Sequence, residues 1–217
     1  MIPIALAPEP ATFDAKVRKK GEAAMLELVG KSAPRRGRRR SPVAKRRDLI
    51  PSDQFPPYWR DVLDEMHKAY EGRCAYLAMY IPKATGNPSV DHVLPRSRHW
   101  RQVYEWSNYR LAAALINSKK NDFELVLDPV AIGPGWFALD FLSMEVVIGP
   151  AASTSKHLEI QDTIKLLGLN LQDCIDQRSE YYLDYKGRDT SLRWLERRAP
   201  FIAQELRRQG MLNPGDA

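Results

Sequence analysis

The chain has 217 residues, of which 44% are hydrophobic, and its formal net charge is +6. This length predicts one globular body with an additional segment, and the hydrophobic fraction is sufficient for a core. No apolar run approaches the roughly 20 residues of a membrane-spanning helix, and the N-terminal stretch lacks the basic leader of a signal peptide. Two distant cysteines, Cys74 and Cys174, form neither a disulfide framework nor a four-ligand zinc site. We therefore expect a reducing, cytoplasmic setting and no membrane partner.

The positive charge is concentrated near the N-terminus. Between Lys31 and Ile50 there are nine basic residues and one acidic residue, Asp48. This stretch therefore has a net charge of +8, and the rest of the chain has a net charge of −2. We expect a basic arm over residues 31–47, with little structure of its own, that binds DNA through released counterions. A solvated linker that only aids solubility is the alternative. The arm residues expected to contact nucleic acid are Arg35, Arg36, Arg38, Arg39, Arg40, Lys45, Arg46 and Arg47.

The first half of the chain predicts helices around two strands. A helix is expected over 13–29, broken near Gly21, and an amphipathic helix over 56–72 ends at Gly72. Two segments have strand character and are separated by a turn, namely 73–81 and 88–94. A further helix is expected around 112–123.

The second half predicts a β-hairpin followed by helices. Residues 135–150 read as two strands joined by a tight turn at Leu142–Ser143. Helices are expected over 153–168, over 171–185 with Asn170 as its cap, and over 190–209 with a kink at Pro200. These elements predict an α+β protein in three parts: 1–50 with the basic arm, 51–125 as a core, and 126–217 as hairpin plus helical region.

The candidate chemistry lies between residues 91 and 117. Asp91 and His92 are adjacent within an apolar strand pattern, and Asn108 and Asn117 follow in largely apolar contexts. A carboxylate, a neutral amide oxygen and waters suit Mg²⁺, and a neighbouring histidine can take a proton from water. These residue types fit metal-assisted phosphodiester hydrolysis. The structural alternative is a hydrogen-bonded Asp–His pair at a strand end, with the asparagines in turns.

The segments "VDHVLPRS", "WSNYRLA" and "NSKKND" together resemble the HNH family of endonucleases, over roughly residues 73–122. This resemblance implies a ββα-metal core, two strands and a helix around one Mg²⁺ or Mn²⁺ ion. It implies that Asp91 and Asn117 are metal ligands and His92 the general base. It further implies that Asn108 braces the loop whose backbone orients the imidazole, and that Lys119 and Lys120 face phosphate.

The chain departs from the HNH pattern at its zinc positions. Many members hold a structural zinc with two Cys-x-x-Cys pairs, but here only Cys74 is retained. Leu77, Ala113 and Ile116 stand in the other three places. We therefore predict no structural zinc, with apolar packing in its place. In the loop after the strand, Arg96 and Arg98 are expected to contact nucleic acid, whereas His99 either joins them or has no role.

The C-terminal half is similar to that of HNH proteins from bacterial anti-phage defence systems, where in the Septu type the nuclease pairs with an ATPase. The resemblances imply a metal-dependent DNA endonuclease acting in defence against phage or foreign DNA, with an ATPase regulatory partner or a homo-oligomer. Two alternatives stay open. One is a non-catalytic nucleic-acid-binding or adaptor module, and the other is an RNA-cleaving toxin nuclease.

Overall fold

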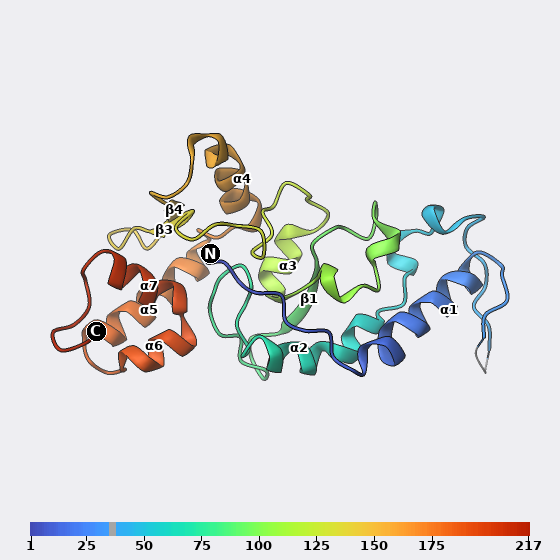
Figure 1. Ribbon diagram of the computed structural model, residues 1–217, viewed down its shortest axis with the longest axis horizontal. Coiled ribbons are helices and arrows are strands. Elements are labelled where there is room, and N and C mark those ends of the chain that lie inside the picture. Colours follow the sequence, from blue (N-terminus) through green and yellow to red (C-terminus); the bar gives the residue numbers. More distant parts are fainter. Residues whose placement is uncertain (35–37) are drawn as a thin grey trace.

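The computed structural model describes residues 1–34 and 38–217 and belongs to the α+β class. Its described part contains helices and two small antiparallel sheets, one pairing β1 with β2 and the other β3 with β4. Along the long axis of the molecule, α1 lies at one end and the C-terminal helices lie at the other, with β1 and α3 between them (Figure 1). The candidate residues on β1 and α3 therefore lie in the middle of the molecule, whereas the basic arm follows α1 at one end (Figure 1).

The N-terminal helix is continuous. A π-helical stretch, Asp14–Arg18, runs directly into α1 (Lys19–Leu28), and Gly30 with φ +75° follows its end. The break expected near Gly21 is wrong, because Gly21 lies buried within α1 against the Tyr104 ring. A Cβ atom at this position would lie 2.2 Å from Tyr104 Cδ2. The glycine therefore permits close packing and does not end the helix.

The central part contains two strands followed by a helix. A 3-10 helix, Tyr58–Val62, leads into α2 (Leu63–Ala69). β1 (Pro88–His92) pairs antiparallel with β2 (Tyr109–Ala113), and α3 (Ala114–Lys120) follows β2 directly and packs against both strands. This pairing sets Asp91 opposite Arg110 and His92 opposite Tyr109.

The strand expected at 73–81 is wrong. These residues form consecutive turns, in which the Cys74 N–H donates to the Met79 carbonyl oxygen at 2.8 Å and Arg73 and Tyr80 form an isolated bridge. Ala78, at φ +51°, has a left-handed backbone that an extended strand does not contain. The true partner of β1 is β2, whose strand character the sequence pattern did not reveal.

The C-terminal half begins with the expected hairpin, β3 (Phe137–Leu139) and β4 (Val146–Ile148), and continues with α4 (His157–Leu167) and α5 (Gln172–Lys186). The kinked final helix is instead two helices, α6 (Leu192–Arg198) and α7 (Pro200–Arg208), because Pro200 starts a new helix. Asn170 does not cap α5. Its side chain accepts from the Val146 N–H at 2.8 Å and donates to the Val146 carbonyl oxygen at 3.0 Å.

Further 3-10 turns connect these elements, at Arg47–Leu49, Ser52–Gln54, Trp100–Gln102, Trp106–Asn108 and Thr154–Lys156. Among the residues the structure describes, none of the helices has the length and apolar character to span a membrane.

One hydrophobic core runs through the molecule and draws buried residues from all three expected parts of the chain, for example Met25, Tyr76 and Ile160. The positions that replace zinc ligands pack with it: Ile116 is fully buried, and Leu77 and Ala113 are partly buried against the core. Cys74 and Cys174 are both free and buried. The Cys74 Sγ accepts weak hydrogen bonds at 3.5 Å from the Leu77 and Ala113 N–H groups, so this thiol is part of the packing.

Candidate functional site

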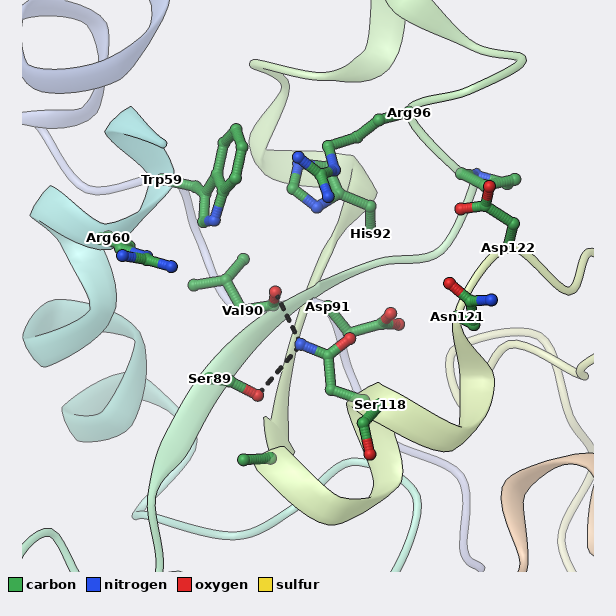
Figure 2. A pocket seen from close by; sticks show the side chains of 13 residues that line it. Trp59, Arg60, Ser89, Val90, Asp91, His92, Arg96, Ser118, Asn121 and Asp122 are labelled. Carbon is green, nitrogen blue, oxygen red and sulfur yellow. Dashed lines mark hydrogen bonds between the residues drawn. The ribbon is translucent and has the colours of Figure 1, made fainter. Parts of the chain in front are cut away.

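A cavity of ≈ 340 Å³ lies where the 3-10 helix at Tyr58–Val62, β1 and α3 meet. Asp91, His92 and Asn117 all line it, although Asn117 is far from the other two in sequence. The remaining polar lining includes Arg60, Arg96, Ser89, Ser118, Asn121 and Asp122 (Figure 2). The β1–β2 pairing and the helix that follows therefore bring three of the four candidate residues to one space.

The His92 imidazole has a fixed orientation. Its Nε2 lies 3.0 Å from the Val103 carbonyl oxygen, which can only accept, so Nε2 carries the proton. The ring makes edge contacts with Trp59 and Tyr109, with centroids 4.8 Å and 5.0 Å away. Burial, with a smaller contribution from the charge of Arg96, lowers the pKa of His92 to about 3. Within the described residues Nδ1 has no hydrogen-bond partner, so a neutral imidazole offers its lone pair there.

Asn108 does not line the cavity and instead holds the loop that follows β1. Its side-chain oxygen accepts from the Leu94 N–H at 2.7 Å, and its amide group donates to the carbonyl oxygens of Leu94 at 3.1 Å and Gln102 at 3.0 Å. Gln102 precedes Val103, whose carbonyl oxygen accepts from His92. The buried Asn108 amide thus fixes both ends of the loop on which the imidazole orientation depends.

The Asp91 carboxylate is 2% exposed and has two protein partners. The Tyr76 hydroxyl donates to Oδ2, and Lys120 Nζ lies 3.3 Å from Oδ1. Burial raises the pKa of Asp91 above its ordinary value, and the Lys120 charge and the Tyr76 hydrogen bond reduce this rise. Both oxygens of the carboxylate therefore have a protein partner.

The Asn117 amide group is oriented by two acceptors on β1. Its Nδ2 donates to Ser89 Oγ at 3.1 Å and to the Val90 carbonyl oxygen at 3.2 Å, the dashed lines in Figure 2. A carbonyl oxygen cannot donate, so these contacts identify the nitrogen and leave Oδ1 as the other terminal atom. Oδ1 has no hydrogen-bond partner in the described part of the chain, and Asn117 lines the cavity.

The cavity's donors suit a hard cation better than zinc. A carboxylate oxygen from Asp91 and an amide oxygen from Asn117, with waters, match the oxygen ligands that Mg²⁺ and Mn²⁺ take. No cluster of three or more His, Cys, Asp or Glu side chains that could hold a metal ion occurs within residues 1–34 and 38–217. The Lys120 ammonium competes with any cation for Asp91. The residues present therefore offer a magnesium-type ion two protein oxygen ligands, and Lys120 already engages one of them.

The expectation that Lys120 faces phosphate is wrong. Its side chain is 1% exposed, and Nζ donates to the carbonyl oxygens of His92 at 2.7 Å and Val93 at 3.2 Å. A buried ammonium needs such acceptors, and with them Lys120 is not among the residues that line the cavity. Its neighbour Lys119 is exposed at the end of α3, as a phosphate contact requires.

Much of the basic arm is folded onto the protein. Arg40 pairs with the buried Glu27 at 3.2 Å and donates to the Tyr58 hydroxyl at 2.7 Å. Other arm residues are also engaged: Arg46 with Asp48 at 2.6 Å, Arg47 with Glu22 at 3.0 Å, and Arg39 with Ser32 Oγ at 3.2 Å. Arg38 has a partner as well. Lys45 is exposed, and Arg35 and Arg36 lie outside the described residues. The described part of the arm thus has no helix or strand before the 3-10 turn at Arg47–Leu49, and Arg40 and Arg47 join it to acids of α1.

Sequence reasoning missed several residues of the site. The sequence pattern singles out neither Trp59 nor Tyr76 as a site residue, yet the Trp59 ring packs on His92 and the Tyr76 hydroxyl donates to Asp91. Arg60, Asn121 and Asp122 also line the cavity. Asn121 has a positive φ of 44° directly after α3, and the polar pair at 121–122 was the available signal.

Comparisons with known proteins do not assign this site. No protein-family model matches the chain, and a search of the curated proteins finds no match. The geometry of the cavity and the chemistry of its residues therefore carry the functional argument.

Proposed function

We propose that this protein is a metal-dependent endonuclease of the HNH type that hydrolyses phosphodiester bonds in DNA, with β1, β2 and α3 as its ββα-metal core. One observation carries the proposal. Asp91, His92 and Asn117 line a single cavity in which the imidazole Nδ1 and the Asn117 Oδ1 have no partner within the described residues.

In the proposed reaction, His92 acts as the general base. The Nε2–H bond to Val103 fixes the tautomer, so Nδ1 is the atom that accepts a proton from the attacking water. The water oxygen then attacks phosphorus, and the bond to the 3′ oxygen breaks. The leaving oxygen takes a proton from solvent, which gives a 5′-phosphate and a 3′-hydroxyl. Burial keeps the imidazole neutral before the reaction. Asn108 is a positioning residue, because it fixes the loop that carries the Val103 carbonyl group.

Asp91 and Asn117 are the residues that would hold Mg²⁺ or Mn²⁺ at this site, through a carboxylate oxygen and an amide oxygen. When bound, the ion supplies charge stabilisation to the phosphate and to the leaving oxygen. The Tyr76 hydroxyl holds the far oxygen of Asp91, and the Ser89 and Val90 contacts hold the nitrogen of Asn117. These contacts orient both oxygen donors before a cation arrives.

The test is plasmid cleavage with Mg²⁺, with Mn²⁺ and with EDTA, comparing the wild type with His92→Ala. We expect cleavage with either ion, none in EDTA, and a loss of about 100-fold or more in the variant, as is typical for removal of a general base. His157→Ala is the control, because His157 lies on α4 and does not line the cavity. Cleavage by His92→Ala at the wild-type rate would exclude the assigned base.

The ion pair of Lys120 with Asp91 favours a second candidate, a non-catalytic nucleic-acid-binding module. In that case a cation within the protein permanently replaces the metal. Titration calorimetry with Mg²⁺ and Mn²⁺ separates the two, because the module binds neither ion at this site. A role in anti-phage defence, a cytoplasmic location and an ATPase partner or homo-oligomer stay predictions, and RNA cleavage stays an alternative.

A further inference from the structure

A second groove of ≈ 410 Å³ adjoins the cavity, and its functional residues are Arg96, Arg98, His99, Trp100 and Arg101. We name it the Trp100 groove. Arg96 lines both the groove and the cavity, so the two spaces meet at this side chain. The loop after β1 supplies all five residues, and its two ends are fixed by Asn108. The groove is therefore held in register with His92.

Trp100 orients positive charge in this groove. The Arg101 guanidinium lies 4.4 Å from the centroid of the indole ring, and that of Arg47 lies 5.8 Å from it. Stacking of this kind fixes the plane of a guanidinium while its N–H groups stay able to donate. Arg101 is exposed and forms no hydrogen bond or close ion pair with any residue that the structure describes. After the hydrogen bond from Arg46, however, its charge helps to lower the pKa of the Asp48 carboxyl in the same groove. The N–H groups of the Arg101 guanidinium can therefore donate hydrogen bonds to a bound ligand.

Arg96 is held in a similar way at the boundary with the cavity. Its guanidinium lies 4.9 Å from the centroid of the Trp59 ring and donates to the Ser52 carbonyl oxygen at 3.1 Å. On another edge of the cavity, Arg60 is exposed and has no side-chain partner within the described ranges (Figure 2). Positive groups therefore stand on both sides of the three candidate residues.

The acids near the groove are already paired with other groups. Asp48 binds Arg46 through both of its oxygens, at 2.6 Å and 3.1 Å. Glu124 contacts Arg98 at 3.5 Å and His99 at 3.0 Å. These contacts offset much of the charge of Arg46 and Arg98, so Arg101 and Arg96 are the main cationic donors available to a ligand.

We infer that the Trp100 groove binds the sugar–phosphate backbone of the nucleic-acid strand on one side of the scissile phosphate, an inference that rests on the proposed nuclease function. Arg101 and Arg96 donate to successive backbone phosphates, and the strand then enters the cavity beside His92. Guanidinium–phosphate contacts carry no base information, so this binding is independent of sequence. Three arginines of the basic arm, Arg40, Arg46 and Arg47, pair with the protein's own acids, so the groove supplies phosphate contacts in addition to those of the arm.

The experiment measures binding separately from cleavage. Fluorescence anisotropy of a short DNA duplex is recorded in EDTA over a series of salt concentrations for the full-length protein. We expect Arg101→Gln to weaken binding about tenfold at low salt, as loss of one charge-assisted contact does. The slope of log affinity against log salt should fall by about one. Trp100→Leu, which keeps the apolar contact with the core but no longer orients the guanidinium, should weaken binding by a smaller factor.

Arg193→Gln is the matched control, because Arg193 is an exposed arginine on α6 and distant from the groove. It should leave affinity and salt slope unchanged. Arg101→Gln with wild-type affinity and slope would overturn the groove assignment and leave the nuclease proposal standing. The opposite pattern combines weaker binding by Arg101→Gln with a wild-type protein that does not cleave DNA. This pattern supports the groove assignment and contradicts the nuclease proposal.

Two further binding measurements test whether the groove contacts the phosphates of one strand without regard to sequence. A second duplex of unrelated sequence should show the same ratio between wild type and Arg101→Gln, and a ratio confined to one sequence would overturn binding through phosphates alone. A single-stranded DNA of the same sequence should show the same loss, because one strand supplies the contacts. Loss confined to the duplex would overturn the assignment to one strand.

Discussion

At the scale of single residues, the contact between Lys120 and Asp91 determines how the buried carboxylate is held. Both side chains are almost fully buried, and Nζ also holds two carbonyl oxygens at the end of β1. Desolvating a charge is costly unless partners compensate it, and here each charge compensates the other. Lys120 therefore stabilises the metal-free protein and keeps the Asp91 carboxylate in place.

We predict that Lys120→Met lowers the free energy of unfolding by about 3–5 kcal/mol, because it leaves a buried carboxylate without its cation. Lys119→Met is the control for stability. Lys119 is exposed on the same helix, and its substitution should change the free energy by less than about 0.5 kcal/mol. Urea denaturation in EDTA measures both. Equal losses in the two variants would contradict a structural role for the buried pair.

At the scale of elements, the sequence predicted the residues of the site better than the strands that carry them. The motif around Asp91 and His92 correctly indicated a strand, found as β1, and the helix with Asn117 is α3. The second strand was expected at 73–81 but is β2, which includes Arg110. Arg110 pairs with Asp128 at 2.6 Å, which compensates its charge within the buried strand. Asp128 lies outside the strand, so the local sequence pattern around Arg110 does not show this compensation.

The packing of Gly21 in α1 also depends on a residue far away in the sequence, Tyr104. Helix propensity alone predicts that Gly21→Ala stabilises the protein by up to about 1 kcal/mol. The contact with Tyr104 outweighs this gain, because a Cβ would lie 2.2 Å from the ring and the neighbours would have to move. We expect a net loss of about 1–3 kcal/mol, the usual cost of overpacking, in thermal or urea unfolding. A more stable Gly21→Ala variant would contradict the close packing of α1 on Tyr104.

At the scale of the whole molecule, the site depends on one core that joins distant segments. Trp59, Tyr76, Asn108 and Asp122 reach the site or its supporting loop from four separate stretches of chain. A pattern read along the sequence can identify a motif and its local element. It cannot show which aromatic ring covers an imidazole or which hydroxyl holds a carboxylate, because those contacts exist only after the core has formed.

Burial of His92 should be visible in the acid stability of the whole protein. Its pKa is lowered to about 3 in the fold from 6.5, so unfolding below the latter value takes up a proton. At neutral pH the buried imidazole therefore does not reduce the free energy of unfolding. As the pH falls below 6.5 towards about 3, the folded protein progressively loses stability relative to the unfolded chain. Between about pH 7 and about pH 5 the wild type should lose about 2 kcal/mol more than His92→Gln. Urea denaturation at both pH values in EDTA measures this difference, and equal losses would contradict a buried neutral imidazole.

The Asn108 amide joins residues 94 and 102 at the base of the loop after β1. A loop closed at its base can change in length or composition at its tip while the ends stay where they are. If the proposed nuclease function holds, phosphate binding at the tip and proton transfer at His92 are separated by this closure. Substitutions at the tip, residues 97–101, would then change the preference for a polyanion without moving the His92 imidazole.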